Sequence, residues 1–240
     1  MEVFMRRLSF FAVLFVSFLL FFSAEAKISG QIRSYVNKTP RSYEDSLDTL
    51  VPYLIKPYTN DYDKAASIAT WIASRIVYDQ FMYNRGKPTE LFEKRVNMSD
   101  EEKEIADSEE DILISRVGTC QDYAKLFSRM AQAAGLEVGT VEGYIVRNKK
   151  RPEKSMTVNN AHVWNYFMYN GKKIYVDTTW MAGGKLPYSS RISEKKREKQ
   201  VNKFEKMNKK RSKIYSVNDY YFDFDYEKER HDFHFEEPQK

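Results

Sequence analysis

The sequence is poor in the residues that build disulfides and metal sites. Its 240 residues include one cysteine, Cys120, and three histidines, His162, His231 and His234. One cysteine excludes an internal disulfide, and three histidines without an H-x-x-x-H pair give poor support for a zinc site. We therefore expect no metal ion and no other cofactor. A lone cysteine in an exported chain suggests a free reactive thiol or an intermolecular disulfide.

The first 26 residues have the pattern of a secretory signal peptide. Two arginines precede an uncharged apolar run at 8–22, and Ala-Glu-Ala follows at 24–26. The run is shorter than the ~20 residues that a membrane span needs, and the tripeptide is typical of a cleavage site. We predict cleavage after Ala26 and an exported protein, periplasmic or secreted. The alternative is a retained N-terminal anchor, which would be its only contact with a membrane.

The other 214 residues (240 minus 26) suit a single domain, which needs no disulfide to bury a core. Residues 191–213 hold eleven Lys or Arg against three Glu, with Phe204 as the only aromatic residue. A solvated segment explains this run better than a nucleic-acid site, so no nucleic-acid partner is expected. Within the domain 27–240 we predict a core at about 43–182, a charged connection at 183–216 and an acidic, aromatic C-terminal segment at 217–240.

Helical periodicity dominates the first half of the domain. Residues 27–42 look irregular, whereas apolar residues at helical spacing predict a helix over 43–55 and an amphipathic helix from Ala65 to Ile76. Asn60 or Asp61 would cap the second helix. A third helix begins at Cys120 after a Gly-Thr pair, and Gly135 is a plausible C-terminal cap. Its apolar stripe consists of Cys120, Tyr123, Phe127, Met130 and Ala134.

Strand patterns follow the helices. Residues 138–145 alternate, and two aromatic, β-branched runs, "AHVWNYFMY" and "KKIYVDTTW", flank Asn170-Gly171. That combination predicts a hairpin closed by a two-residue type I′ turn. The C-terminal segment could return as another strand. Helices first and hairpins later indicate an α+β fold with an antiparallel sheet.

The predicted turn fixes a register for the hairpin. Tyr169 would face Lys172, and by extension Trp164 would face Asp177. His162 then shares a face with Trp164 and is a diagonal neighbour of Asp177, with the backbones about 7–8 Å apart and the side chains within reach. Either residue alone is more often an ordinary sheet histidine or a turn-forming aspartate. Their joint placement favours a carboxylate that orients an imidazole base.

Cys120 has two interpretations. It could be a small apolar filler at the start of a buried helix. Alternatively, the helix N-terminus and an adjacent imidazolium would stabilise its thiolate. Nucleophile, base and orienting acid would then follow in the chain order Cys120, His162, Asp177.

The stretches "RVGTCQDYAKLFSRMAQAAGLEVGTVEGY", "AHVWNYF…NGKKIYVDTTW" and "KAASIATWIASRIVYD" resemble the transglutaminase-like superfamily. The resemblance covers roughly 62–182 and implies a papain-like fold, in which a cysteine heads a helix packed on an antiparallel sheet. It implies that Cys120, His162 and Asp177 form the triad. The tail shows a fainter resemblance to the branch typified by cytokinesis and muscle-associated proteins, from which it departs at His234, so we assign His234 no role.

Further site residues are expected from the same resemblance. Tyr78 is a candidate for holding the oxyanion beside the backbone N–H of Cys120, although a tyrosine ending an amphipathic helix is more often a core residue. Trp164 and Trp180 are candidates for lining the groove. The leading hypothesis is an exported thiol enzyme, of cysteine protease or transglutaminase type, that cleaves or transfers acyl groups from amide bonds of a protein or peptide. Whether water or an amine resolves the thioester, and the oligomeric state, stay open.

Two other hypotheses compete with an enzyme. The groove could be a protein-binding module without turnover, with the basic run and the acidic tail covering it or docking a partner. An intact Cys-His-Asp set argues against this. Cys120 could also form an intermolecular disulfide, which burial at a helix start disfavours.

Overall fold

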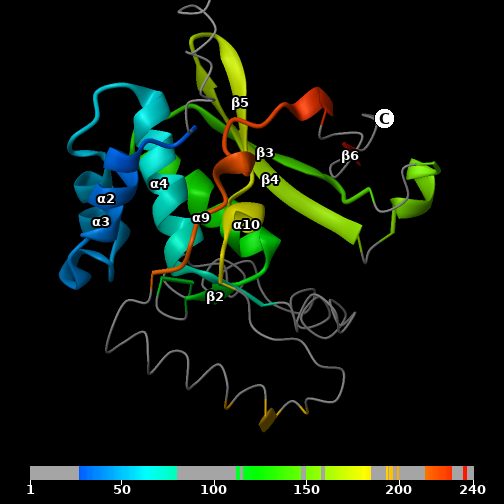
Figure 1. Cartoon of the computed structure of the whole chain (residues 1–240), viewed down its shortest axis with the longest axis horizontal. Helices are drawn as coiled ribbons and strands as arrows, with labels where there is room; N and C mark the ends of the chain where they lie inside the picture. Colours follow the sequence, from blue (N-terminus) through cyan, green and yellow to red (C-terminus); the bar gives the residue numbers. More distant parts are fainter. Residues whose placement is uncertain are drawn as a thin grey trace, which may run out of the picture.

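The chain folds into helices packed beside an antiparallel sheet (Figure 1). The computed structural model describes residues 27–79, 112–113, 116–146, 150–157, 160–184, 193, 195–196, 199, 214–228 and 235–236. The predicted signal peptide, most of the basic run and both His231 and His234 lie outside these residues. Among the described residues, no helix combines the length and the apolar character needed to cross a membrane.

The N-terminal layer consists of three helices: α2 (Gly30–Asn37), α3 (Leu47–Ile55) and α4 (Asp61–Arg75), with a 3-10 turn, η1 (Arg41–Tyr43), before α3. Helix α4 is the central one, because α2, α3 and the later helix α9 (Cys120–Ala133) all contact it. Asn60 caps α4 by accepting from the backbone N–H of Asp63 at 2.8 Å, so the predicted cap is confirmed. Nearly every residue of α4 beyond its first turn is buried, which explains its small apolar side chains.

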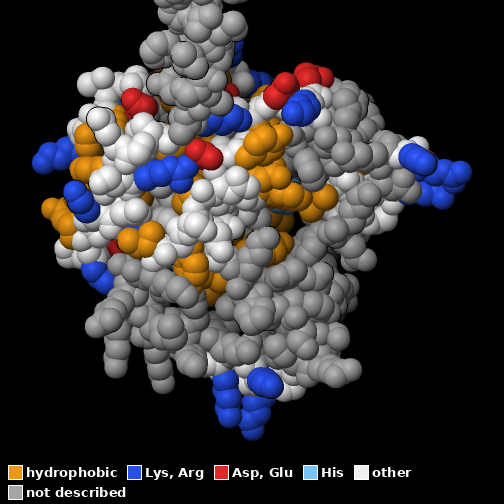
Figure 2. Space-filling view, in the orientation of Figure 1, with side chains coloured by type: hydrophobic (Ala, Val, Ile, Leu, Met, Phe, Trp, Pro, Cys, Tyr) orange, Lys and Arg blue, Asp and Glu red, His pale blue; other side chains and the backbone are white. Residues whose placement is uncertain are grey.

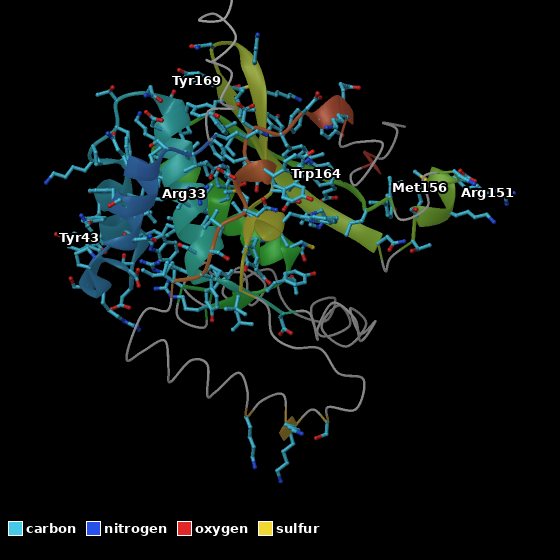
Figure 3. The ribbon with its side chains drawn as sticks, in the orientation of Figure 1. Arg33, Tyr43, Arg151, Met156, Trp164 and Tyr169 are labelled. Atoms are coloured by element: carbon cyan, nitrogen blue, oxygen red, sulfur yellow. The ribbon has the colours of Figure 1, made fainter. Side chains whose placement is uncertain are left out.

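A four-stranded antiparallel sheet forms the other layer, in the order β5-β4-β3-β6. Its strands are β3 (Val138–Tyr144), β4 (Ala161–Tyr169), β5 (Lys172–Val176) and β6 (Phe235–Glu236), and a 3-10 turn, η2 (Pro152–Ser155), lies in the β3–β4 connection. Figure 3 shows Trp164 near the middle of β4, with Arg151 and Met156 at the far end of that connection. The α+β prediction is therefore correct.

Helix α9 packs on both β3 and β4. The side chain of Asn165, on β4, donates to the hydroxyl of Ser128 on α9 at 2.9 Å, and the Ser128 hydroxyl lies 3.3 Å from that of Thr140 on β3. The predicted apolar stripe of α9 is buried from Tyr123 onward, and Gly135 ends the helix with a φ of 79°. These contacts fix where the first turn of α9 lies relative to the sheet.

The C-terminal segment returns to the sheet. Val217 bridges Ala182, Phe222 bridges Val176, and β6 pairs with the Gly143–Tyr144 end of β3. The segment also holds a short 3-10 turn, η4 (Asp219–Tyr221). In the view of Figure 2, hydrophobic side chains reach the surface in separate groups, and Lys and Arg lie both at the rim and between these groups.

A buried ionic cluster anchors the segment that leads to Cys120. The carboxylate of Glu44 accepts from Arg75 Nε at 3.1 Å and from Trp71 Nε1 at 3.2 Å, and it lies 3.5 Å from Arg116 Nη2. The Arg116 guanidinium also stacks 4.6 Å from the Trp71 ring centre. Burial lowers the pKa of Arg116 to about 10, although Glu44 opposes that shift. Arg116 stands directly before β2 (Val117–Gly118), which pairs in parallel with β1 (Val77–Tyr78).

Two predictions about elements were wrong. Residues 27–42 contain α2 and η1, although they looked irregular. The second strand of the hairpin ends at Val176 rather than continuing to Trp180, because Asp177 caps a short helix, α10 (Thr178–Met181).

Candidate functional site

Cys120 is the first residue of α9, as the sequence predicts. Asp122, in the first turn, accepts from the backbone N–H of Thr119 at 2.7 Å and from its hydroxyl at 3.0 Å. Gly118 permits this turn, because a Cβ at that position would lie 2.8 Å from the Cβ of Asp122. The thiol is partly exposed. It therefore lies at the positive end of the helix dipole, which stabilises a nearby anion.

The hairpin brings His162 and Asp177 together. The ladder pairs Tyr169 with Lys172 and continues to Asn165 with Val176, and both turn residues have positive φ, 49° for Asn170 and 73° for Gly171. The predicted type I′ turn and its register are therefore confirmed. The ladder ends one pair before the extrapolated Trp164–Asp177 pair. His162 Nε2 nevertheless lies 2.6 Å from Asp177 Oδ2.

Each carboxylate oxygen of Asp177 has a hydrogen-bond partner. Oδ2 faces the imidazole, while Oδ1 accepts from the backbone N–H of Trp180 at 3.0 Å. The second bond caps α10 and holds the carboxylate plane in place. With Nε2 committed to Asp177, Nδ1 is the ring nitrogen left to interact with Cys120, which lies close enough to raise the pKa of His162.

The three groups form a chain of charges in a buried setting. Burial lowers the pKa of His162. The carboxylate of Asp177 and the sulfur of Cys120 raise it by more than burial lowers it, so the pKa is about 10. His162 and Asp177 are both almost fully buried. The arrangement therefore favours an imidazolium at neutral pH beside the sulfur of Cys120.

A cleft of about 300 Å³ opens at this cluster. Its walls come from the start of α9 and from the paired ends of β3 and β4, so the thiol and the imidazole share one accessible space. It is lined by Cys120, Gln121, Glu142, Gly143, Tyr144, Ala161, His162 and Val163.

The remaining predicted site residues lie outside this lining. Trp164 is only 1% exposed and stacks behind His162, with ring centres 5.8 Å apart, so it supports the imidazole rather than lining a groove. Trp180 is half-buried and meets His162 edge-on at 6.0 Å. Tyr78 pairs with Gly118 on β1, and its ring packs 6.4 Å from that of Tyr123. The structure therefore gives Tyr78 a packing contact.

Several residues of the cleft were not predicted. Gln121 follows Cys120 directly in the sequence, and this position alone could have predicted that it lies at the cleft. Glu142 and Tyr144 alternate with Gly143 on β3, and Gly143 stands opposite His162 in the ladder. That pairing crosses a long β3–β4 connection, so no turn fixed it in advance. Within the part of the chain that the structure describes, no group of three or more His, Cys, Asp or Glu side chains could hold a metal ion.

The raised pKa of His162 predicts a stability that falls with pH. An imidazole has a pKa near 6.5 in the unfolded chain and about 10 here, so between those values the folded state binds more protons. Its stabilisation is fully present below pH 6.5 and is lost as the pH rises through about 10. We expect the free energy of unfolding of the wild type, relative to His162→Gln, to decrease from pH 6 to pH 10 in urea titrations. A difference that grows with pH would mean that the folded state holds a neutral imidazole.

Comparisons with known proteins cover the central part of the chain. Residues 48–182 match the model of the transglutaminase-like superfamily. The chain is 29% identical over 140 residues to the kyphoscoliosis peptidases of mouse and human, a stretch that covers 58% of this chain but only 19% of each relative. A crystal structure of a TGase aligns with 78% of this chain and 42% of its own at 14% identity and a TM-score of 0.35. The periplasmic domain of TgpA from Pseudomonas aeruginosa aligns over 66% and 52% at 19% identity and a TM-score of 0.40.

Proposed function

Because this chain belongs to the transglutaminase-like superfamily, we propose that it is a thiol enzyme that cleaves or transfers acyl groups from amide bonds of proteins or peptides. The observation that carries the proposal is the 2.6 Å contact between His162 and Asp177 at the cleft that also contains Cys120. The three residues come from separate elements: Cys120 begins α9, His162 lies on β4, and Asp177 caps α10.

The proposed reaction has two steps. In the first, the Cys120 thiolate attacks the carbonyl carbon of the amide, and the His162 imidazolium gives its proton to the leaving amine as the C–N bond breaks. In the second, water or another amine attacks the thioester carbonyl, the neutral imidazole takes its proton, and the C–S bond breaks to release the acyl product and the Cys120 thiolate. The backbone N–H of Cys120, at the unpaired end of α9, is a donor for the oxyanion.

Asp177 holds the imidazole ready for both steps. Its carboxylate stabilises the imidazolium before the first proton transfer, and accepting from Nε2–H afterwards keeps Nδ1 available as the base. Tyr78 stays a candidate for a second oxyanion donor only if its hydroxyl can turn toward the cleft. We also propose that the protein is exported after cleavage behind Ala26, so that N-terminal sequencing of the mature protein would begin at Lys27.

Trapping the thioester tests the function. Purified protein, mixed with the active ester 4-nitrophenyl acetate and quenched in acid, should gain one acetyl group that peptide mass spectrometry maps to Cys120. Incubation with casein and a primary amine would then separate the two reactions. Casein fragments would indicate hydrolysis, and casein joined to the amine would indicate transfer. Cys120→Ser should lose the trapped thioester, and His162→Ala should lower its rate of formation sharply. A wild-type thiol that acylates no faster than a free cysteine would contradict the proposal and leave a binding module.

A further inference from the structure

One acidic side chain in the cleft, that of Glu142, makes no polar contact with the described residues. Glu142 is exposed, lines the same space as Cys120 and His162, and makes no hydrogen bond or ion pair within the described part of the chain. The other acid of the site, Asp177, is fully buried and occupied on both oxygens. Glu142 is thus the acid that an incoming substrate can reach.

The ladder places Glu142 next to the pair that contains His162, on the face of the sheet that contacts α9. Glu142 pairs with Val163 and Tyr144 with Ala161, one on each side of the Gly143–His162 pair. Paired residues share a face of the sheet. Thr140, two residues earlier on this face, lies 3.3 Å from Ser128 of α9.

The geometry of α9 extends this wall to the thiol. From Ser128 back to Cys120 the helix covers eight residues, about 12 Å at ~1.5 Å per residue. From Thr140 to Tyr144 the strand covers a similar length, about 14 Å at ~3.4 Å per residue. The start of α9 and the Tyr144 end of β3 both reach the cleft, and Glu142 is part of its lining.

In the lining of the cleft, no positive charge is left to offset Glu142. The imidazolium of His162 is already paired with the buried carboxylate of Asp177, and Gln121, Gly143, Tyr144, Ala161 and Val163 carry no charge. We propose that Glu142 is a specificity-determining residue that selects substrates with a lysine or arginine side chain beside the acyl group that Cys120 attacks. Selection among substrates rests on the proposed function. The preference of the cleft for positive charge can be measured separately, from the reactivity of the Cys120 thiol.

Charged thiol reagents test the selection without any turnover. Methanethiosulfonates transfer their thioalkyl group to a thiolate and release methanesulfinate, and they exist with a trimethylammonium-ethyl, a sulfonato-ethyl or a methyl group. The rate constant for the cationic reagent divided by that for the anionic one reports the local charge, and the methyl reagent reports intrinsic reactivity. In wild type we expect a ratio well above that of free cysteine. In Glu142→Gln it should fall about five- to tenfold, since each exposed charge contact is worth up to about fivefold in rate.

A matched variant separates local from global charge. Glu137→Gln removes the same charge from an exposed position just before β3, where Val138 pairs with Phe167 at the opposite end of the ladder from His162. Its ratio should stay within twofold of wild type. Glu142→Lys should lower the ratio below that of Glu142→Gln. Equal ratios in wild type, Glu142→Gln and Glu142→Lys would overturn the proposal and make Glu142 an ordinary solvated acid.

A substrate arm keeps the two proposals distinguishable. The probes are the 4-nitrophenyl esters of Nα-acetyl-lysine, Nα-acetyl-norleucine and Nα-acetyl-glutamate, read as kcat/KM. Preference for lysine over glutamate that falls in Glu142→Gln supports the inference. Ester turnover with no such preference overturns the inference and leaves the proposed function standing. If no ester reacts but the reagent ratio still depends on Glu142, the proposed function fails and the cleft still selects cations.

Discussion

Asp177→Asn should lower the rate of thioester formation by about 100-fold or more while leaving the fold nearly intact. Asparagine has almost the same shape, so the change replaces one acceptor oxygen with an amide N–H₂ donor. The equivalent exchange in a serine protease triad costs ~10⁴ in turnover. We expect a smaller loss here because a thiol ionises more easily than a hydroxyl and depends less on its base.

The second partner of Asp177 decides which way the new amide turns. The backbone N–H of Trp180 is a fixed donor, 3.0 Å from Oδ1. The asparagine carbonyl must take that bond to keep the cap of α10, which points its N–H₂ group at Nε2 of His162. A donor at Nε2 forces the imidazole proton onto Nδ1, the nitrogen that faces Cys120. The imidazole then cannot accept the thiol proton, and the loss of the carboxylate also lowers the pKa of His162.

A pair of variants separates chemistry from structure. Asp177→Asn keeps the cap, whereas Asp177→Ala removes both the cap and the orienting group, so only the alanine variant should lose an additional ~1 kcal/mol of stability. The measurement is the rate of acetylation of Cys120 from pH 5 to 10, beside a urea titration. An Asp177→Asn protein that acylates Cys120 at the wild-type rate would show that Asp177 serves only as a helix cap.

The sequence was most informative where chemistry is local. Asn170-Gly171 has the two positive φ values that a type I′ turn needs, so the register could be counted outward from it to His162 and Asp177. The start of α9 at Cys120 followed from Gly118-Thr119 and the apolar stripe in the same way. Both inferences needed only contacts within a few residues of a strong turn or cap signal.

Prediction failed where tertiary contacts decide. Helix α2 has just two buried apolar positions, Ile32 and Val36, which are too few for a periodic signal. β5 ends at Val176 because Asp177 is the N-cap of α10. The sequence alone does not distinguish this role of the aspartate from that of a strand residue. Glu142 reaches the cleft only because β3 pairs with β4 across a long connection, for which the sequence offers no turn to count from.

Glu44→Gln should lower the free energy of unfolding by about 3–5 kcal/mol. Glu44 is 1% exposed and is the carboxylate shared by Arg75 and Arg116, whose side chains are 2% and 5% exposed. Glutamine keeps the size and can still accept from Trp71, but it removes the negative charge that offsets two buried guanidiniums. Breaking a buried ion pair on one side leaves a charge without compensation, which costs far more than the pair contributes.

The loss of the Glu44 charge should also change the position of Cys120, because Arg116 links the two. Arg116 has a backbone φ of 58°, which is uncommon for a residue other than glycine. Its guanidinium donates to the backbone carbonyl of Glu44 at 3.0 Å. Two residues later Gly118 leads into α9, so a loosened Arg116 should shift Cys120 and slow its acetylation. Urea unfolding measures the stability, with Glu137→Gln, the same exchange at an exposed position away from this cluster, as the control that should change it by less than about 0.5 kcal/mol. If Glu44→Gln proves as stable as Glu137→Gln, the two arginines have other compensation and the cluster does not anchor the site.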